Sequence, residues 1–117
     1  VPSVNGKLQG HAQRVQVPDG SVTELTTVLN TETTADEINE AFKAAFSDTD
    51  YYGYNDEGIV SSDILGDTHG GVFDPTQTDV NTIDGVTLAR TVSFYDNEYG
   101  FTSNMIRTLL YFAEISE

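Results

Sequence analysis

The sequence contains no cysteine, and this absence removes several kinds of chemistry from the chain. Without a thiol there is no disulfide framework, no cysteine metal site and no cysteine nucleophile. No apolar run approaches the roughly 18 residues that a membrane-spanning helix needs. Residues 1–6 lack the pattern of a signal peptide and do not begin with methionine. We therefore expect a cytoplasmic protein, of which this chain is one piece.

Basic residues are also scarce. Five Lys and Arg stand against 19 Asp and Glu, which gives a formal net charge of −14 over 117 residues. Nucleic acid and anionic membrane surfaces are excluded as partners, because their phosphates need Lys and Arg. The acidic residues are dispersed, as on a folded surface, and do not form one block as in a disordered tail. Dispersed acid with little lysine favours a halophilic source, where salt screens the repulsion, over an ordinary acidic domain.

Two segments have the apolar spacing of helices. In the first, Thr34 and Glu37 match a capping box, and apolar residues follow at positions 38, 41, 42, 45 and 46. The second runs from Glu98 to Ile115 and carries a wide apolar surface. A well-buried terminal helix explains that width, and so does packing against a domain outside this chain.

Strand signals fill most of the remaining sequence. We expect one hairpin with strands at 15–17 and 21–29, and a second with strands at 79–83 and 86–94 around Asp84-Gly85. Shorter strands are expected at 51–54, 58–65 and 72–74. On the strand at 86–94, alternation places Leu88, Val92 and Phe94 on one face. The order of elements predicts one α+β domain over residues 1–117, with a mostly antiparallel sheet and helices on one face.

Two long motifs resemble the glyceraldehyde-3-phosphate dehydrogenase family. Residues 5–18, NGKLQGHAQRVQVP, are similar to the family run NGKLxGxAxRVPxP, and residues 93–104, SFYDNEYGFTSN, are similar to SWYDNExGYSxR. Shorter matches between them keep the family order: GY at 53–54, VSSD at 60–63, DTH at 67–69 and FD at 73–74. The resemblance covers this whole chain but only the C-terminal part of a family subunit.

The resemblance implies part of an enzyme that oxidises and phosphorylates glyceraldehyde 3-phosphate to 1,3-bisphosphoglycerate with NAD or NADP. In the family pattern the nucleophilic cysteine, the acid–base histidine and the dinucleotide-binding domain lie upstream of the first motif. We therefore expect no catalytic residue in this chain, no tight binding of the cofactor and no activity from it alone. The resemblance also implies an upstream dinucleotide-binding domain as partner and a homo-tetramer. The alternative is a free-standing, non-catalytic assembly or binding module derived from that domain.

Four residues take candidate roles from the resemblance. Arg14 matches the family arginine that binds phosphate, and a guanidinium offers a fixed fork of donors to an oxyanion. A surface ion pair is the alternative for Arg14. Asn97 matches the asparagine that orients the nicotinamide carboxamide; a helix N-cap or turn asparagine is its alternative, and both roles can hold together. Tyr95 and Phe101 flank that turn as cofactor contacts, although core packing is the favoured interpretation of both, and Phe101 lacks the hydroxyl of the family's usual tyrosine.

No metal site is expected. His69 and Asp63 could suggest an acid–base or metal pair, but the family's catalytic histidine lies upstream and no EF-hand spacing is present. His11 has no partner identifiable from the sequence and is expected to be exposed. The glycines at 70 and 71 replace two serines of the family pattern and predict a looser loop.

Overall fold

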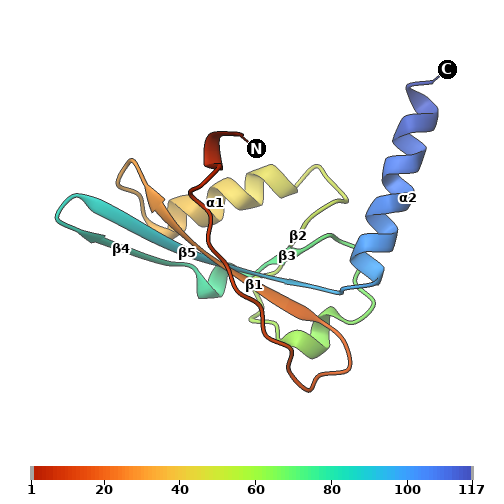
Figure 1. The fold of residues 1–117 in the computed structure, drawn as a ribbon, viewed down its shortest axis with the longest axis horizontal. Coiled ribbons are helices and arrows are strands. Elements are labelled where there is room, and N and C mark those ends of the chain that lie inside the picture. The colour runs from red at the N-terminus through yellow and green to blue at the C-terminus, as the bar shows by residue number, and fades with distance from the viewer. Residues whose placement is uncertain (1, 117) are drawn as a thin grey trace.

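The structure is a computed structural model that describes residues 2–116. Its strands are β1 (Ser21–Leu29), β2 (Gly53–Tyr54), β3 (Val72–Phe73), β4 (Asp79–Ile83) and β5 (Val86–Tyr95). Its α-helices are α1 (Ala35–Phe46) and α2 (Tyr99–Glu114), and its 3-10 helices are η1 (Pro2–Val4), η2 (Ser61–Ile64) and η3 (Pro75–Gln77). Figure 1 shows α1 lying along the sheet and α2 extending away from one end of it.

Strand β5 is the centre of the sheet. It pairs antiparallel with β1, β3 and β4, while β2 pairs parallel with β3. The predicted α+β fold with a mostly antiparallel sheet is confirmed. The register of β1 on β5 runs from Ser21 opposite Tyr95 to Leu29 opposite Thr87. This register brings the beginning of β1 to the end of β5, where the candidate site lies.

The two faces of the sheet are covered differently. On one face, Phe42 of α1 stacks on Phe73 with ring centroids 4.2 Å apart. On the opposite face, Ile64 of η2 packs with Val72, Val92 and Phe94 in a small buried cluster. Leu88 shares this face with Val92 and Phe94, as predicted, but it is 42% exposed and lies outside the cluster, because η2 reaches only one end of that face. A small core leaves much apolar surface open.

Helix α1 begins as the sequence predicts. The Glu37 amide donates to Thr34 Oγ1 at 3.2 Å, and the Thr34 amide donates to Glu37 Oε2 at 2.9 Å. This reciprocal pair is a capping box, which satisfies amides left free at a helix start. The backbone hydrogen bond from Thr34, with those from the hydroxyls of Thr33 and Thr34, lowers the pKa of the Glu37 carboxyl.

The predicted strands at 15–17 and 58–65 are wrong. Residues 2–18 are all exposed and contain no strand, because β1 pairs along its whole length with the distant β5. Within 58–65 the chain forms η2 instead. There the Val60 amide donates to Asp63 Oδ2 and the Asp63 amide donates to the Val60 carbonyl, both at 2.9 Å. Such local bonding competes with pairing in a sheet.

The second predicted hairpin is confirmed as β4 and β5. Asp84 and Gly85 both adopt positive φ, 51° and 78°, as a two-residue type I′ turn requires. The strands expected at 51–54 and 72–74 are present in shorter form as β2 and β3.

Helix α2 forms where it was predicted, but its expected burial is wrong. Among the described residues of α2, Gly100 is the buried one. The exposed large apolar residues include Phe101, Met105, Ile106, Leu109, Leu110, Tyr111 and Phe112. Arg107 anchors the helix by donating to the Thr68 carbonyl at 2.7 Å. Contacts within residues 2–116 therefore do not explain why apolar side chains cover so much of the surface of α2. None of the described helices combines the length and hydropathy needed to cross a bilayer.

Candidate functional site

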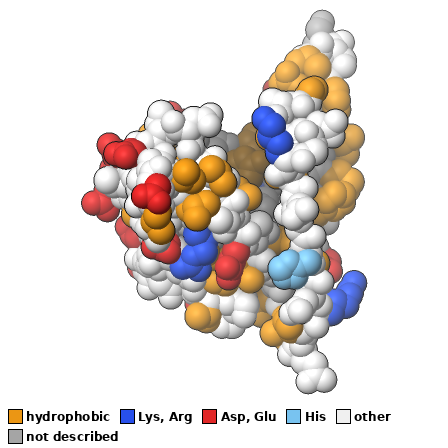
Figure 2. All heavy atoms as spheres, turned by 60° about the vertical axis from the view of Figure 1, so that its left-hand side comes forward, with side chains coloured by type: hydrophobic (Ala, Val, Ile, Leu, Met, Phe, Trp, Pro, Cys, Tyr) orange, Lys and Arg blue, Asp and Glu red, His pale blue; other side chains and the backbone are white. Residues whose placement is uncertain are grey.

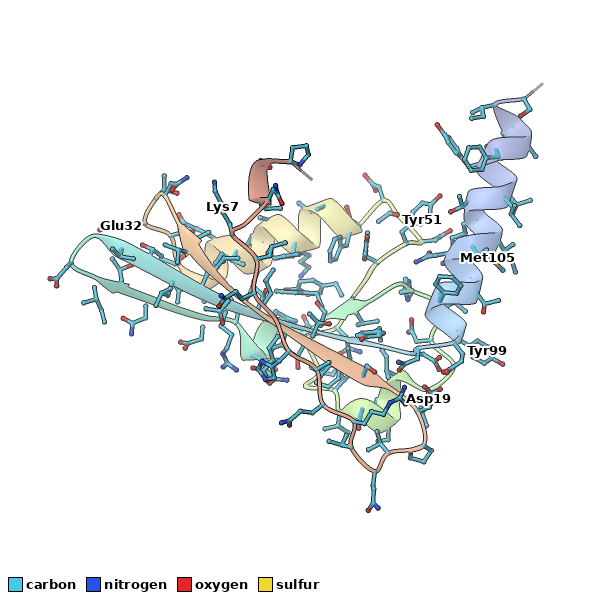
Figure 3. The ribbon with its side chains drawn as sticks, viewed as in Figure 1. Lys7, Asp19, Glu32, Tyr51, Tyr99 and Met105 are labelled. Atoms are coloured by element: carbon cyan, nitrogen blue, oxygen red, sulfur yellow. The ribbon has the colours of Figure 1, made fainter. Side chains whose placement is uncertain are left out.

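The candidate site lies where β1 begins and β5 ends. Because Ser21 stands opposite Tyr95, the turn before β1 and the turn after β5 lie side by side. The Ser21 hydroxyl donates to Asn97 Oδ1 across the two turns at 2.7 Å. Figure 3 shows Asp19 and Tyr99, labelled, at this same end of the sheet. Asn97 is exposed, so its amide is open to a ligand.

Asp96 fixes the backbone of the turn that carries Asn97. The Asp96 side chain is buried, and its Oδ1 accepts from the amides of Glu98 at 3.0 Å and Tyr99 at 2.7 Å. Its Oδ2 accepts from the Gly66 amide at 2.8 Å. The hydrogen bonds from Gly66 and Tyr99 lower the pKa of Asp96, so it stays a carboxylate. Asp96 thus accepts from the first amide of α2, at Tyr99. Asn97 is not the N-cap but lies in the turn before the helix, so the N-cap interpretation of Asn97 is wrong and the turn interpretation is confirmed.

Three carboxylates gather beside Asn97. One oxygen each of Asp19, Asp96 and Glu98 lie within 4.8 Å of one another. The hydrogen bond and negative charge of Asp19 raise the pKa of Glu98. The Glu98 carboxyl is therefore protonated more readily than an isolated glutamate. The negative charge at this end of the sheet disfavours an anion there and favours a positively charged ligand group.

Arg14 lies in the exposed segment before this turn. Its side chain is exposed, and within residues 2–116 its guanidinium makes neither a hydrogen bond nor an ion pair. The surface ion pair suggested as an alternative is therefore not formed among those residues. The described pair between arginine and carboxylate is Arg90 with Glu24, at 3.8 Å. The guanidinium of Arg14 remains available to an oxyanion.

Tyr95 and Phe101 face different cavities. Tyr95 is half-buried and lines a cavity of about 430 Å³ between α1 and the sheet, together with Phe42 and Phe46. Phe101 is 72% exposed and lines a separate apolar groove of about 330 Å³ along α2. The core-packing interpretation is therefore partly correct for Tyr95, which is half-buried, and wrong for Phe101, which is exposed. The exposed turn with Asn97 lies between these two residues in the sequence.

His69 pairs with Asp67 and not with Asp63. The Nδ1 of His69 lies 2.8 Å from Asp67 Oδ1, while Asp63 accepts from the Val60 amide. His11 is exposed, as expected. At Gly70 a side chain would collide with the amide of Asn104 on α2. That amide can rotate away; the backbone contact that requires glycine is at Gly100 of α2, where a Cβ would meet the His69 carbonyl oxygen.

Sequence reasoning selected Asn97 but missed Ser21 and Asp96 as its neighbours. The Ser21–Asn97 contact joins residues 76 positions apart, so it depends on the register of β1 against β5. The sequence did offer a signal for Asp96. At a helix start, an aspartate side chain commonly accepts from the backbone amides two and three residues after it.

The chain is an α+β domain with a mostly antiparallel sheet, and its sequence contains no cysteine. The sequence profile of "Glyceraldehyde 3-phosphate dehydrogenase, C-terminal domain" matches residues 1–97. The chain belongs to this family, and the resemblance drawn from its motifs is confirmed.

Individual relatives extend the match to the whole chain. A glyceraldehyde-3-phosphate dehydrogenase of Streptococcus pyogenes is 52% identical over 117 residues, which are 100% of this chain and 34% of that protein. A glyceraldehyde-3-phosphate dehydrogenase of Lactobacillus delbrueckii subsp. bulgaricus is 54% identical over 115 residues, 98% of this chain and 33% of that protein. The chain thus spans about a third of these curated relatives. Neither source organism supports the halophilic origin inferred from charge.

Proposed function

We propose that this chain is the C-terminal part of the catalytic domain of a phosphorylating, NAD- or NADP-dependent glyceraldehyde-3-phosphate dehydrogenase. The observation that carries the proposal is the exposed Asn97 amide on the turn after β5, in a chain that belongs to this family. The cysteine, the histidine and the dinucleotide-binding domain would lie in the two thirds of the relatives that the chain does not cover. The complete protein would work in the cytoplasm.

The Asn97 turn fits the nicotinamide end of the cofactor. Asn97 Oδ1 already accepts from Ser21, and among residues 2–116 its Nδ2 donates to no partner. Those two N–H groups suit the carbonyl oxygen of a carboxamide. The carboxylates of Asp19, Asp96 and Glu98 favour the positive charge of an oxidised nicotinamide ring. When bound, the cofactor supplies the hydride acceptor, and this chain's part is to orient the ring.

Arg14 would bind the phosphate that enters the reaction. Its unpaired guanidinium can donate two parallel hydrogen bonds to an oxyanion, which fixes the anion's orientation as well as its charge. In a chain with a net charge of −14, such a group is needed to offset the repulsion of an anionic substrate. Tyr95 and Phe101 would contribute apolar contacts near the cofactor from the two sides of the Asn97 turn in the sequence.

The upstream domain is the proposed partner of helix α2. Figure 2 shows α2 standing apart from the body of the chain, with a hollow between them and hydrophobic side chains along the helix. Phe101, Met105, Leu109 and Phe112 line the groove on α2, and at least 47% of each is exposed. Apolar surface of this extent is stabilised by being covered.

The face of the sheet opposite α1 is the proposed contact with a second copy. Val22, Val28 and Leu88 lie on this face and are 50%, 70% and 42% exposed. A face of one chain that packs on the same face of another would satisfy a two-fold interface, as in the expected tetramer. The exposed apolar faces also favour the alternative of an assembly module, which would need no upstream catalytic half.

Two substitutions in the complete protein test the proposed function. We expect Arg14→Gln to raise the KM for phosphate about 10-fold or more, because a charge-assisted bidentate contact is lost. Asn97→Ala should raise the KM for the cofactor instead. Arg90→Gln is the matched control and should change neither constant, since Arg90 pairs with Glu24 within the sheet.

The 117-residue chain alone should show no NAD(P) reduction above buffer. Turnover by the purified chain, or unchanged constants in both Arg14→Gln and Asn97→Ala, would refute the proposal. The coding sequence before Val1 should contain a cysteine followed by a histidine. An unrelated sequence there would favour the assembly module.

A further inference from the structure

Ser21 constrains the orientation of the Asn97 amide. The Ser21 hydroxyl donates to Asn97 Oδ1 at 2.7 Å, and Ser21 is itself held by its pairing with Tyr95 at the start of β1. The backbone beneath Asn97 is held independently, because Asp96 accepts from the Gly66, Glu98 and Tyr99 amides. With both backbones fixed, the main freedom left at this point is rotation of the Asn97 side chain.

A side-chain amide can present either its oxygen or its nitrogen to a ligand, depending on a half-turn about its last bond. In the structure the Ser21 hydroxyl donates to the amide oxygen, and this bond holds Asn97 in one of the two states. It occupies Asn97 Oδ1 and leaves Nδ2, with two N–H donors, without a partner among residues 2–116. A group recognised at this point must therefore offer a hydrogen-bond acceptor.

We propose that Ser21 is a positioning residue that holds Asn97 with its Nδ2 donors toward the cofactor, so that the site reads the carbonyl oxygen of the carboxamide. This inference rests on the proposed function, in which Asn97 meets the nicotinamide. Ser21 touches no reacting atom and acts through Asn97.

A cofactor analogue isolates the carbonyl contact. The 3-acetylpyridine analogue of NAD keeps the carbonyl oxygen and lacks the amino group, so an Asn97 side chain can bind it only through Nδ2. The dissociation constants of this analogue and of NAD are measured by calorimetry with the complete protein, which reports binding without turnover. In the unsubstituted protein the two constants should agree within about 3-fold.

The matched pair of variants is Ser21→Thr and Ser21→Val. Their side chains have nearly the same shape, both suit a strand, and only threonine keeps the hydroxyl. Ser21→Val should weaken binding of the analogue about 5-fold, the effect of one neutral hydrogen bond. Ser21→Thr should bind it within about 2-fold of the original constant. Thr26→Ala, which removes an exposed hydroxyl on β1, should leave the constant unchanged.

The outcomes separate the two proposals. If Asn97→Ala weakens binding but Ser21→Val and Ser21→Thr bind the analogue equally well, the role of Ser21 is overturned and the proposed function stands. If Asn97→Ala leaves both dissociation constants unchanged, the proposed function itself fails at this residue. A difference of about 5-fold between the Val and Thr variants supports the positioning role, because a purely structural contribution from side-chain shape would affect both alike.

Discussion

At the scale of single residues, the polar groups beside Asn97 have opposed electrostatic roles. Asp96 is buried and ionised because backbone amides surround its carboxylate. Glu98 lies on the exposed turn and shares a hydrogen bond with Asp19, which raises its pKa. One carboxylate therefore fixes the turn, while the pair next to it makes the turn sensitive to pH.

Asp96→Asn should destabilise the chain by about 2–3 kcal/mol. The substitution places an NH₂ group against backbone amides that need an acceptor, and hydrogen bonds to a charged group are worth roughly 1.5–3 kcal/mol. Urea unfolding measures the change. Asp79→Asn, at an exposed position on β4, is the control and should change stability by less than about 0.5 kcal/mol. If Asp96→Asn lowers the free energy of unfolding by no more than Asp79→Asn does, Asp96 does not anchor the turn.

Glu98→Gln should be more stable at pH 7 than the control variant Glu57→Gln, which removes the same charge from an exposed loop. Because the pKa of Glu98 is raised above its ordinary 4.5, its stabilising contribution is complete below about pH 4.5 and is lost as pH rises through the folded-state value. Glutamine keeps a donor toward Asp19 at every pH. The melting temperatures of the two variants should therefore differ at pH 7 and converge below about pH 4. Equal melting temperatures at pH 7 would exclude the expected cost of ionising Glu98 beside Asp19.

The pH dependence of Asp96 has the opposite sign. Its pKa lies below the ordinary value of 3.8, so the stability it contributes is present above that value and is lost as pH falls through the lower, folded-state pKa. Protonation of Asp96 at low pH is thus expected to weaken the turn before α2, in the pH range where the Glu98 contribution is already complete.

At the scale of elements, local signals were sufficient for some predictions and not for others. The capping box of α1 and the Asp84-Gly85 turn lie within a few residues of the structure they specify, and both were predicted correctly. Strand β1 was expected to pair with 15–17, but its partner β5 is remote in sequence. Register between remote strands is not encoded in either strand alone, so the Ser21–Asn97 contact could not be predicted.

The apolar face of α2 leads to a prediction that depends on the length of the protein tested. Leu109 is 61% exposed, so Leu109→Ser should change the stability of the 117-residue chain by less than about 0.5 kcal/mol. In the complete protein we expect a loss of about 2 kcal/mol or more, because the same side chain would be buried against the upstream domain. Thr102→Ser, on an exposed position of α2, serves as control in both. Equal effects of Leu109→Ser in the two proteins would contradict docking.

At the scale of the whole molecule, the chain is more extended than a self-contained domain of its length. Its radius of gyration is 16.1 Å, with extents of 52 × 40 × 30 Å. A compact chain of this length is expected to have a radius of about 13 Å. Helix α2 projects from one end of the sheet and the β4–β5 hairpin reaches out at the other, as Figure 1 shows. This shape supports the proposal that further polypeptide completes the fold.

The net charge of −14 gives a prediction for the molecule as a whole. The melting temperature should rise between about 0.1 M and 2 M KCl, because the Debye length falls from about 10 Å to less than about 3 Å and repulsion between dispersed carboxylates is screened. A variant with Asp48→Asn, Asp50→Asn, Asp56→Asn and Glu57→Gln, all exposed, should show a smaller rise from a higher starting value. Equal slopes in the two proteins would assign the salt effect to strengthened apolar burial. A flat or falling curve would contradict a destabilising repulsion among the carboxylates. If the melting temperature of the unsubstituted chain rises more steeply with KCl, its stabilisation by salt is due to the four carboxylates that the variant lacks.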